Sequence, residues 1–178
     1  MQYNSIDDLV LHVGLDDSNH AGERKGEIIV ATFSFDPEDC IKRKHGARAN
    51  YLRAKEWLTS SDKNYRFTIL LDEQFRHLNT NLSQYTPDLV KSFLENYRRQ
   101  INSISLNFDG KLSIEERASL MKSFNKLDNL EINNFPKAKH KNYNCPLVVY
   151  MADTIAHHLY QRPLSSLLED KRYVSLKT

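Results

Sequence analysis

Two segments of the sequence alternate between apolar and other residues, and both end on an aspartate. Residues 9–16 read LVLHVGLD, with small or polar residues on one face up to Asp16. Residues 101–109 read INSISLNFD, with polar residues on one face up to Asp109. A period of two residues is that of a β-strand. The pattern therefore predicts two strands whose C-terminal ends carry a carboxylate on the less apolar face.

The other segments predict two more strands early in the chain, and later strands that alternate with helices. The strands are expected at residues 9–16, 27–35, 65–72, 101–109 and 130–135, and the helices at 87–100, from Ser113 onward and at 146–161. Thr86 before Pro87, and Ser113 three residues before Glu116, are typical helix starts. Residues 38–60 lack β-branched runs, which favours one or two inserted helices after the second strand. The order is βββαβαβα, an antiparallel meander followed by parallel additions.

The composition favours one α/β domain over residues 1–178. Hydrophobic residues make up 40% of the chain, and its 5 Gly and 5 Pro are scattered rather than gathered in a linker. No apolar run is long enough to span a bilayer, and the N-terminus MQYNSIDDLV does not resemble a signal peptide. Cys40 and Cys145 have no zinc spacing and are expected to be reduced thiols. We therefore expect a cytoplasmic protein without membrane contact.

Three aspartates are candidate metal ligands. Adjacent strands lie about 4.8 Å apart, so Asp16 and Asp109 would share one edge of the sheet if their strands are parallel neighbours. Asp153 lies in the apolar helical segment VVYMADTIA, where an unpaired buried charge is costly. Crowded carboxylates repel one another unless a cation lies between them, and oxygen ligands suit Mg²⁺ or Mn²⁺. We expect the three carboxylates to converge on one such site.

Simpler interpretations of these residues stay open. Asp16 and Asp17 could merely begin a turn, and Asp109 precedes Gly110, which is an ordinary turn signal. Asp153 could face solvent. His157 lies four residues further along the same helix face, where it could carry a proton or make a structural hydrogen bond.

Two basic clusters are candidate phosphate contacts. The first spans residues 42–48 and includes Arg43 and Lys44, and the second spans residues 137–141 and includes Lys139 and Lys141. Clusters of this kind can bind a nucleic-acid backbone, although a solvated surface is the alternative. The net charge of +2 does not decide between the two.

Three motifs, in the right order, carry a resemblance to a known superfamily. GLDDSNHAG at 14–22 resembles the opening of type 2 ribonucleases H, with Asp17 in place of their usual Glu, and LNFDG at 106–110 resembles their fourth strand. YMADTIAHHL at 150–159 is similar to the closing helix of a related, uncharacterised ribonuclease-H-like group, where an Ala-Asp pair supplies the last acid. The order βββαβαβα is also that of the ribonuclease-H-like fold.

The resemblance implies a mixed five-stranded sheet with a helical insert, in which the first and fourth strands are parallel neighbours. It also implies a metal-dependent nuclease. Asp16, Asp109 and Asp153 would bind Mg²⁺ or Mn²⁺, with Asp17 and His157 as auxiliary catalytic residues. RNA or an RNA–DNA hybrid is the favoured substrate. A branched-DNA (Holliday-junction-type) resolvase and a catalytically silent module that binds nucleic acid or protein are the alternatives.

The chain departs from type 2 ribonucleases H at one position. Their fourth acid stands in a Lys-Ala-Asp context before the last helix, where this chain has Lys137-Ala138-Lys139. Asp153 would have to take its place. A phosphotransferase is disfavoured because no Gly-rich phosphate loop is present. The oligomeric state is left open.

Overall fold

The central element is a mixed five-stranded sheet. The computed structural model describes residues 9–18, 26–44, 57–59, 65–70, 82–97, 101–135 and 144–176. The strands of this sheet are β1 (Val10–Asp17), β2 (Glu27–Ser34), β4 (Tyr65–Leu70), β5 (Ser103–Asp109) and β6 (Asn129–Phe135), in the order β4-β2-β1-β5-β6. β2 is antiparallel to both of its neighbours, whereas β1, β5 and β6 are parallel. This confirms the predicted ribonuclease-H-like fold.

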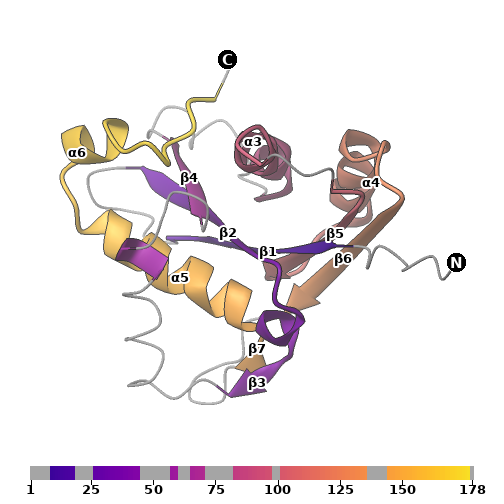
Figure 1. Ribbon diagram of the computed structural model, residues 1–178. Coiled ribbons are helices and arrows are strands. Elements are labelled where there is room, and N and C mark those ends of the chain that lie inside the picture. The colour runs from indigo at the N-terminus through magenta and orange to yellow at the C-terminus, as the bar shows by residue number, and fades with distance from the viewer. Residues whose placement is uncertain are drawn as a thin grey trace, which may run out of the picture.

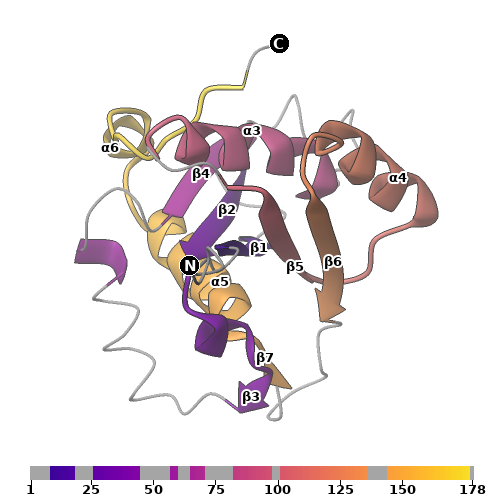
Figure 2. The same ribbon diagram turned by 45° about the vertical axis from the view of Figure 1, so that its right-hand side comes forward.

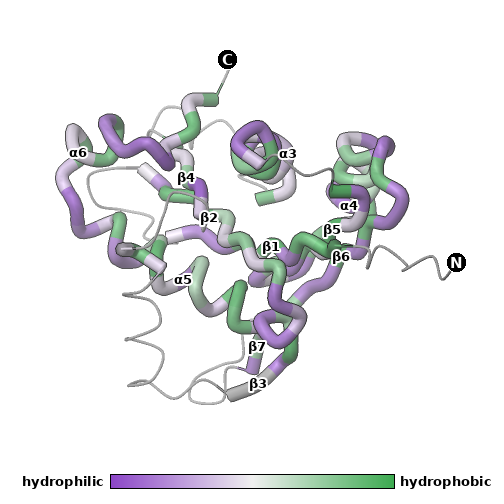
Figure 3. The backbone as a smooth tube through the Cα atoms, viewed as in Figure 1, coloured by the Kyte–Doolittle hydropathy of each residue, from purple (hydrophilic) through white to green (hydrophobic). Residues whose placement is uncertain are grey.

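Helices cover both faces of the sheet (Figures 1 and 2). On one face lie α3 (Leu82–Leu94) and α4 (Ile114–Ser123), and on the other lies α5 (Leu147–Tyr160), which is followed by α6 (Leu164–Leu168). Each face has its own hydrophobic core, because the strands alternate their side chains between the two sides. Hydrophobic residues run through α5 and the central strands, whereas β6 is largely hydrophilic (Figure 3). No helix among the described residues is long and apolar enough to cross a bilayer.

The starts of two helices test the predicted caps. The Ser113 capping box is present: the Ser113 hydroxyl accepts from the Glu116 amide at 3.2 Å, and the Glu116 carboxylate accepts from the Ser113 amide at 2.6 Å. The predicted cap at Thr86 was wrong, because α3 begins at Leu82 and ends at Leu94. The Thr86 hydroxyl instead donates to the Leu82 carbonyl at 2.8 Å. Leu82 and Tyr85 are buried, so packing extends the helix beyond the point that Pro87 suggested.

The insert after β2 contains both helical and extended backbone. It opens with the 3₁₀ turn η1 (Pro37–Cys40), and residues 57–59 are again helical. Between them β3 (Arg43–Lys44) pairs with β7 (Asn144–Cys145), so the expectation of helix was wrong at these two residues. The pairing partner lies about a hundred residues further along the chain, and local sequence cannot reveal it. Residues 45–56 and 60–64 lie outside the described part.

The outer edge of β4 is covered by the segment that follows α6. The Phe67 amide donates to the Arg172 carbonyl at 3.0 Å, and the Val174 amide donates to the Phe67 carbonyl at 2.8 Å. The Thr68 hydroxyl also donates to the Val174 carbonyl, at 2.8 Å. We call residues 172–174 the strap. It satisfies edge groups of β4 that would otherwise face water.

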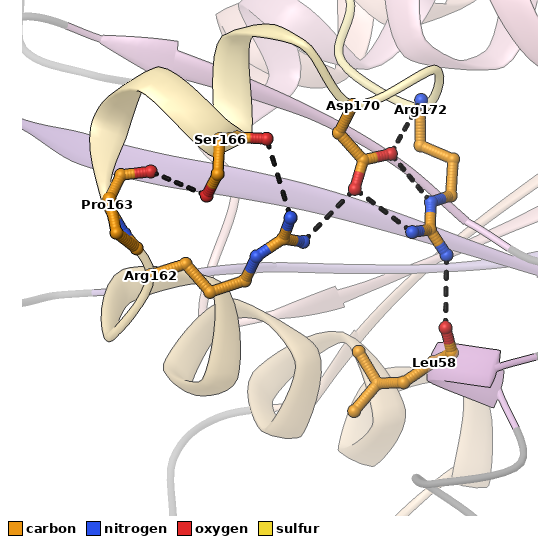
Figure 4. Close-up of polar contacts among 6 residues, drawn as sticks. All are labelled: Leu58, Arg162, Pro163, Ser166, Asp170 and Arg172. Carbon is orange, nitrogen blue, oxygen red and sulfur yellow. Dashed lines mark hydrogen bonds and ion pairs between the residues drawn. The ribbon is translucent and has the colours of Figure 1, made fainter.

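A carboxylate between two arginines holds the strap in place (Figure 4). Asp170 accepts hydrogen bonds from the Arg172 side chain at 2.9 and 3.0 Å and from Arg162 at 3.1 Å. Arg172 also donates to the Leu58 carbonyl at 3.2 Å and lies 4.3 Å from the centre of the Tyr65 ring. Burial alone would raise the pKa of Asp170, but the arginine contacts outweigh it and lower the pKa to about 2.

Candidate active site

Asp16 and Asp109 lie side by side at the C-terminal ends of β1 and β5. The parallel register pairs Gly14 with Asn107 and Leu15 with Phe108, and the next residue on each strand is the aspartate. Both carboxylates are on the α5 side, because Gly14 faces α5 and strand side chains alternate. Asp16 is 1% exposed and Asp109 is 9% exposed. The structure therefore places two nearly buried carboxylates next to each other at one end of the sheet.

A glycine and a threonine fix α5 against this part of the sheet. Gly14 lies so close to α5 that a Cβ there would be 2.2 Å from the Val148 carbonyl carbon and oxygen. Thr32 is the register partner of Gly14 on β2, and its hydroxyl donates to the Val148 carbonyl at 2.7 Å. The first turn of α5 is thereby held against β1 by backbone contact at Gly14, which is two residues before Asp16.

Buried polar side chains continue from Asp109 along the same face of β5. The Asn107 amide, 2% exposed, donates to the Val13 carbonyl at 3.1 Å and to the Ser105 carbonyl at 3.0 Å. Its own oxygen accepts from the Asn133 amide at 3.3 Å. One side chain thus links β1, β5 and β6 below the aspartates, and it holds these three strands in register.

η1 covers the far end of this polar row. Cys40 Sγ lies 3.5 Å from Asn107 Nδ2, and burial raises the pKa of the Cys40 thiol to about 12, so the thiol stays protonated at neutral pH. Burial lowers the pKa of His12 in the same row, while the carboxylates of Glu131 and Asp39 act in the opposite sense. The Cys40 thiol therefore lacks the negative charge that a nucleophilic cysteine requires at neutral pH.

The other predicted site residues are less closely gathered. Asp17 is half-buried, its amide donates to Asp16 Oδ1 at 2.8 Å, and strand alternation turns its side chain toward α3. Asp153 is on the exposed side of α5. His157 is also exposed, and its Nε2 lies 3.1 Å from Gln161 Nε2. The predicted burial of Asp153 was wrong, because the apolar face of α5 is turned the other way.

The predicted phosphate contacts are only partly described. Arg43 and Lys44 form β3, next to the segment that leads into α5. Lys139 and Lys141 lie outside the described residues. Contacts from these four residues to a nucleic acid therefore stay a prediction.

The donor set suits a hard divalent cation in part. Asp16 and Asp109 offer oxygen atoms from adjacent strands, which is the chemistry that Mg²⁺ and Mn²⁺ favour. Within the described ranges, no group of three or more His, Cys, Asp or Glu side chains is placed to hold a metal ion. The pair thus fits two ligand positions, and the convergence of Asp153 on it stays a prediction.

Sequence reasoning found the two aspartates and missed the residues that support them. The sequence identified Asn107 and Ser105 only as part of the polar face of a strand. The alternation of polar and apolar residues along that strand was the one signal that its polar face could be buried. No signal pointed to Cys40, because η1 folds back from the insert. Thr32 gave none either, since its partner is a backbone carbonyl of a distant helix.

The fold and the carboxylate pair define a chain of the ribonuclease-H-like class of α/β folds. No protein-family model and no curated protein sequence matches it. Among solved structures it is similar to the ribonuclease H2 from Pyrococcus horikoshii OT3, with 15% identity, a TM-score of 0.47, and coverage of 93% of this chain and 81% of that one.

Two other ribonuclease structures are similar to a comparable degree. One is Bst-RNase HIII in complex with Mn²⁺, with 15% identity, a TM-score of 0.49, and coverage of 89% of this chain and 54% of that one. The other is the RNase HII of the PCNA:RNase HII complex from Archaeoglobus fulgidus, with 15% identity, a TM-score of 0.47, and coverage of 93% and 82%. At this identity the likeness concerns the fold.

Proposed function

We propose that this chain is a metal-dependent nuclease that hydrolyses nucleic-acid phosphodiester bonds. The observation that carries the proposal is the pair of nearly buried carboxylates, Asp16 and Asp109, at the carboxyl ends of adjacent parallel strands. In open α/β sheets the crevice at this end, where the connections diverge, is the usual ligand site. Two carboxylates there supply the oxygen donors of a Mg²⁺ or Mn²⁺ site.

The chain would contribute position and charge to the reaction. A bound divalent metal would supply an activated water and would stabilise the leaving oxygen. Asp16 and Asp109 would hold it from β1 and β5, whose register the Asn107 amide fixes. We assign His157 an auxiliary role at the rim of the site, and Asp17 an auxiliary role through its amide, which donates to Asp16 Oδ1.

Asp153 is the proposed third ligand. α5 begins near η1 and runs toward α6, in the same sense as β1 (Figure 1). Asp153 is five residues beyond Val148, or about 7.5 Å along a helix, and Asp16 is two residues beyond Gly14, or about 6.6 Å along a strand. Since Val148 lies on Gly14, the two aspartates are at about the same height along the sheet. Exposure of Asp153 leaves its carboxylate accessible to a metal.

RNA or an RNA–DNA hybrid is the substrate we favour, with Arg43, Lys44, Lys139 and Lys141 as contacts to its phosphates. A branched-DNA resolvase is the second candidate, because an acid on the long helix that follows the last strand, here Asp153 on α5, also suits that activity. A silent binding module of the same fold is the third, and it would need no metal.

Thermal unfolding with and without Mn²⁺ tests the metal site. Wild type should melt at a higher temperature with Mn²⁺. At a metal concentration of a hundred times the Kd, binding adds about 2.7 kcal/mol to the free energy of unfolding. Without metal, Asp16→Asn and Asp109→Asn should be as stable as wild type or more so, because one of two neighbouring like charges is removed. With Mn²⁺ both should fall below wild type. Asp88→Asn, an exposed aspartate on α3, is the matched control and should respond like wild type.

The same melts decide the role of Asp153. If it is a ligand, Asp153→Asn should lose part of the Mn²⁺ response, and if it is only a solvated residue, the variant should behave like Asp88→Asn. A wild-type melt that does not change with Mn²⁺ would contradict the nuclease proposal and favour the silent module.

Cleavage assays then separate the substrates. The wild-type protein is incubated with RNA–DNA hybrid, duplex RNA and four-way junction DNA, with and without Mn²⁺, and Asp109→Asn serves as the inactive control. We expect metal-dependent cleavage of the hybrid or of RNA. Cleavage of the junction alone would instead identify the resolvase.

A further inference from the structure

An apolar stripe lies on the outer side of α4, away from the proposed site. Ile114 is 82% exposed and Met121 is 63% exposed. Ala118, which is also exposed, lies between them. Residues four and seven positions apart share one side of a helix, so the three form a continuous surface, which we call the α4 stripe. Exposed apolar residues grouped in this way mark a surface that contacts a partner.

The stripe helix packs beside an edge strand of the sheet. α4 lies beside β6, the last strand of the sheet (Figure 2). Arg117 of α4 donates to the Ile132 carbonyl of β6 at 3.1 Å. The Asn134 amide oxygen accepts from the same guanidinium at 2.6 Å. The Arg117 side chain thus turns toward β6, while the apolar side chains of the α4 stripe face outward, where a partner can pack on the helix itself.

Charges beside the stripe select the partner. Glu115 lies in the first turn of α4 and Lys122 in the last, and both are exposed. They are seven residues apart, so they follow the same side of the helix. A second α4 packed antiparallel would bring Glu115 against Lys122 at both ends of the contact. In a parallel two-fold pair the flanks that carry these charges would lie on opposite sides of the contact, so Glu115 and Lys122 would gain no partner across it.

The apolar residues fit the same arrangement. In an antiparallel pair Ile114 of one copy lies opposite Met121 of the other, and the two Ala118 residues meet at the centre. The small alanine lets the helix axes approach closely, and antiparallel helix dipoles attract. A two-fold interface uses one self-complementary patch, which the α4 stripe and its flanking charges form.

We propose that α4 forms the two-fold interface of a homodimer, with the two copies of the helix antiparallel. A single pair of ten-residue helices is a small interface, so the dimer is weak and reversible. The interface lies on the face of the sheet opposite α5, so dimerisation leaves the carboxylate pair open. The proposal does not depend on the nuclease activity.

Sedimentation velocity of the full chain over a concentration series tests the proposal. Wild type should shift from the monomer mass toward twice that mass as concentration rises. Met121→Ser should remain monomeric at concentrations where wild type dimerises. Leu168→Ser is the matched control, because Leu168 is an exposed apolar residue of α6 at 49% exposure, and it should dimerise like wild type. A wild-type chain that stays monomeric throughout overturns the proposal.

A charge swap tests the antiparallel geometry. Glu115→Lys and Lys122→Glu should each weaken the dimer about tenfold, because two attractive pairs become repulsive. The double variant E115K/K122E should restore the wild-type dissociation constant. The melting temperatures of the single and double variants serve as the folding control. If the double variant is as stable as either single variant but its dissociation constant does not return to the wild-type value, the proposed arrangement is overturned. A dimer that persists unchanged in Met121→Ser overturns the use of this surface.

Discussion

Replacement of Gly14 by alanine should separate α5 from the sheet. The new Cβ would lie 2.2 Å from the Val148 carbonyl carbon and oxygen and 2.6 Å from the Val149 nitrogen. Ordinary contacts begin at 3.4 Å, so the closest approach is too short by 3.4 minus 2.2, or 1.2 Å. The obstructing atoms are backbone atoms of a helix, and no rotamer change can move them aside. α5 as a whole must move away from β1.

The loss of stability in Gly14→Ala can be estimated from the side chains that α5 buries against the sheet. Leu147, Val148, Met151 and Ile155 are among its residues that are almost fully buried against the sheet. A gap of about 1 Å removes up to half of the dispersion energy of the contacts it opens, and overpacking in a core typically costs about 1–3 kcal/mol. We expect Gly14→Ala to lose about 3 kcal/mol, which lowers the melting temperature by roughly 6–12 °C for a chain of this size.

Urea unfolding followed by circular dichroism measures this loss. Gly110→Ala is the matched control, because Gly110 has φ +111° but nothing within 4 Å of an added Cβ. It should lose only the strain of a positive φ, about 1–2 kcal/mol. If Gly14→Ala unfolds at the same urea concentration as wild type, or is more stable than Gly110→Ala, the argument for close approach fails.

Three further predictions concern individual contacts. Thr32→Val should lower the free energy of unfolding in urea by about 1 kcal/mol, because the buried Val148 carbonyl loses the hydrogen bond from the Thr32 hydroxyl, whereas Thr32→Ser should keep most of the stability. Asn107→Leu should lower the free energy of unfolding by about 2 kcal/mol and should speed amide hydrogen exchange in β1 and β5. Unchanged exchange would refute the role of the Asn107 amide in linking these strands. Asp170 has its pKa lowered from 3.8 to about 2, so its stabilising effect is complete above pH 3.8 and is lost as pH falls through 2. Asp170→Asn should be less stable than wild type at neutral pH and should flatten this acid limb of the stability curve; equal slopes would refute it.

Local patterns predicted the strands of the sheet because apolar and polar residues alternate strongly along them. The segment 9–16 became β1 at Val10–Asp17, and 101–109 became β5 at Ser103–Asp109. The parallel pairing of these two strands, and with it the adjacency of Asp16 and Asp109, was expected from the resemblance to the ribonuclease-H-like fold. The strands themselves depend on short-range periodicity, whereas their order in the sheet depends on contacts that local patterns do not encode.

The features that sequence missed depend on contacts distant in the chain. Arg43 and Lys44 are extended because Asn144 and Cys145 lie beside them. α3 begins early because Leu82 is buried against other elements, although Thr86 and Pro87 form a strong local start signal. The side of α5 that Asp153 occupies depends on how the helix packs on Gly14, and a short apolar helix does not encode its own rotation.

The strap has a consequence for the order in which the chain acquires its structure. Thr68 and Val174 meet across 106 positions of sequence. β4 can pair with β2 as soon as both have been synthesised, but its outer edge stays open until residues 172–174 have left the ribosome. During that interval the nascent chain carries an unprotected sheet edge, which is a site for misassociation with other chains. The Arg172 contacts to Asp170 and Leu58 therefore act late, as the step that closes the edge, and variants that weaken them should lower the yield of folded protein more than they lower its final stability.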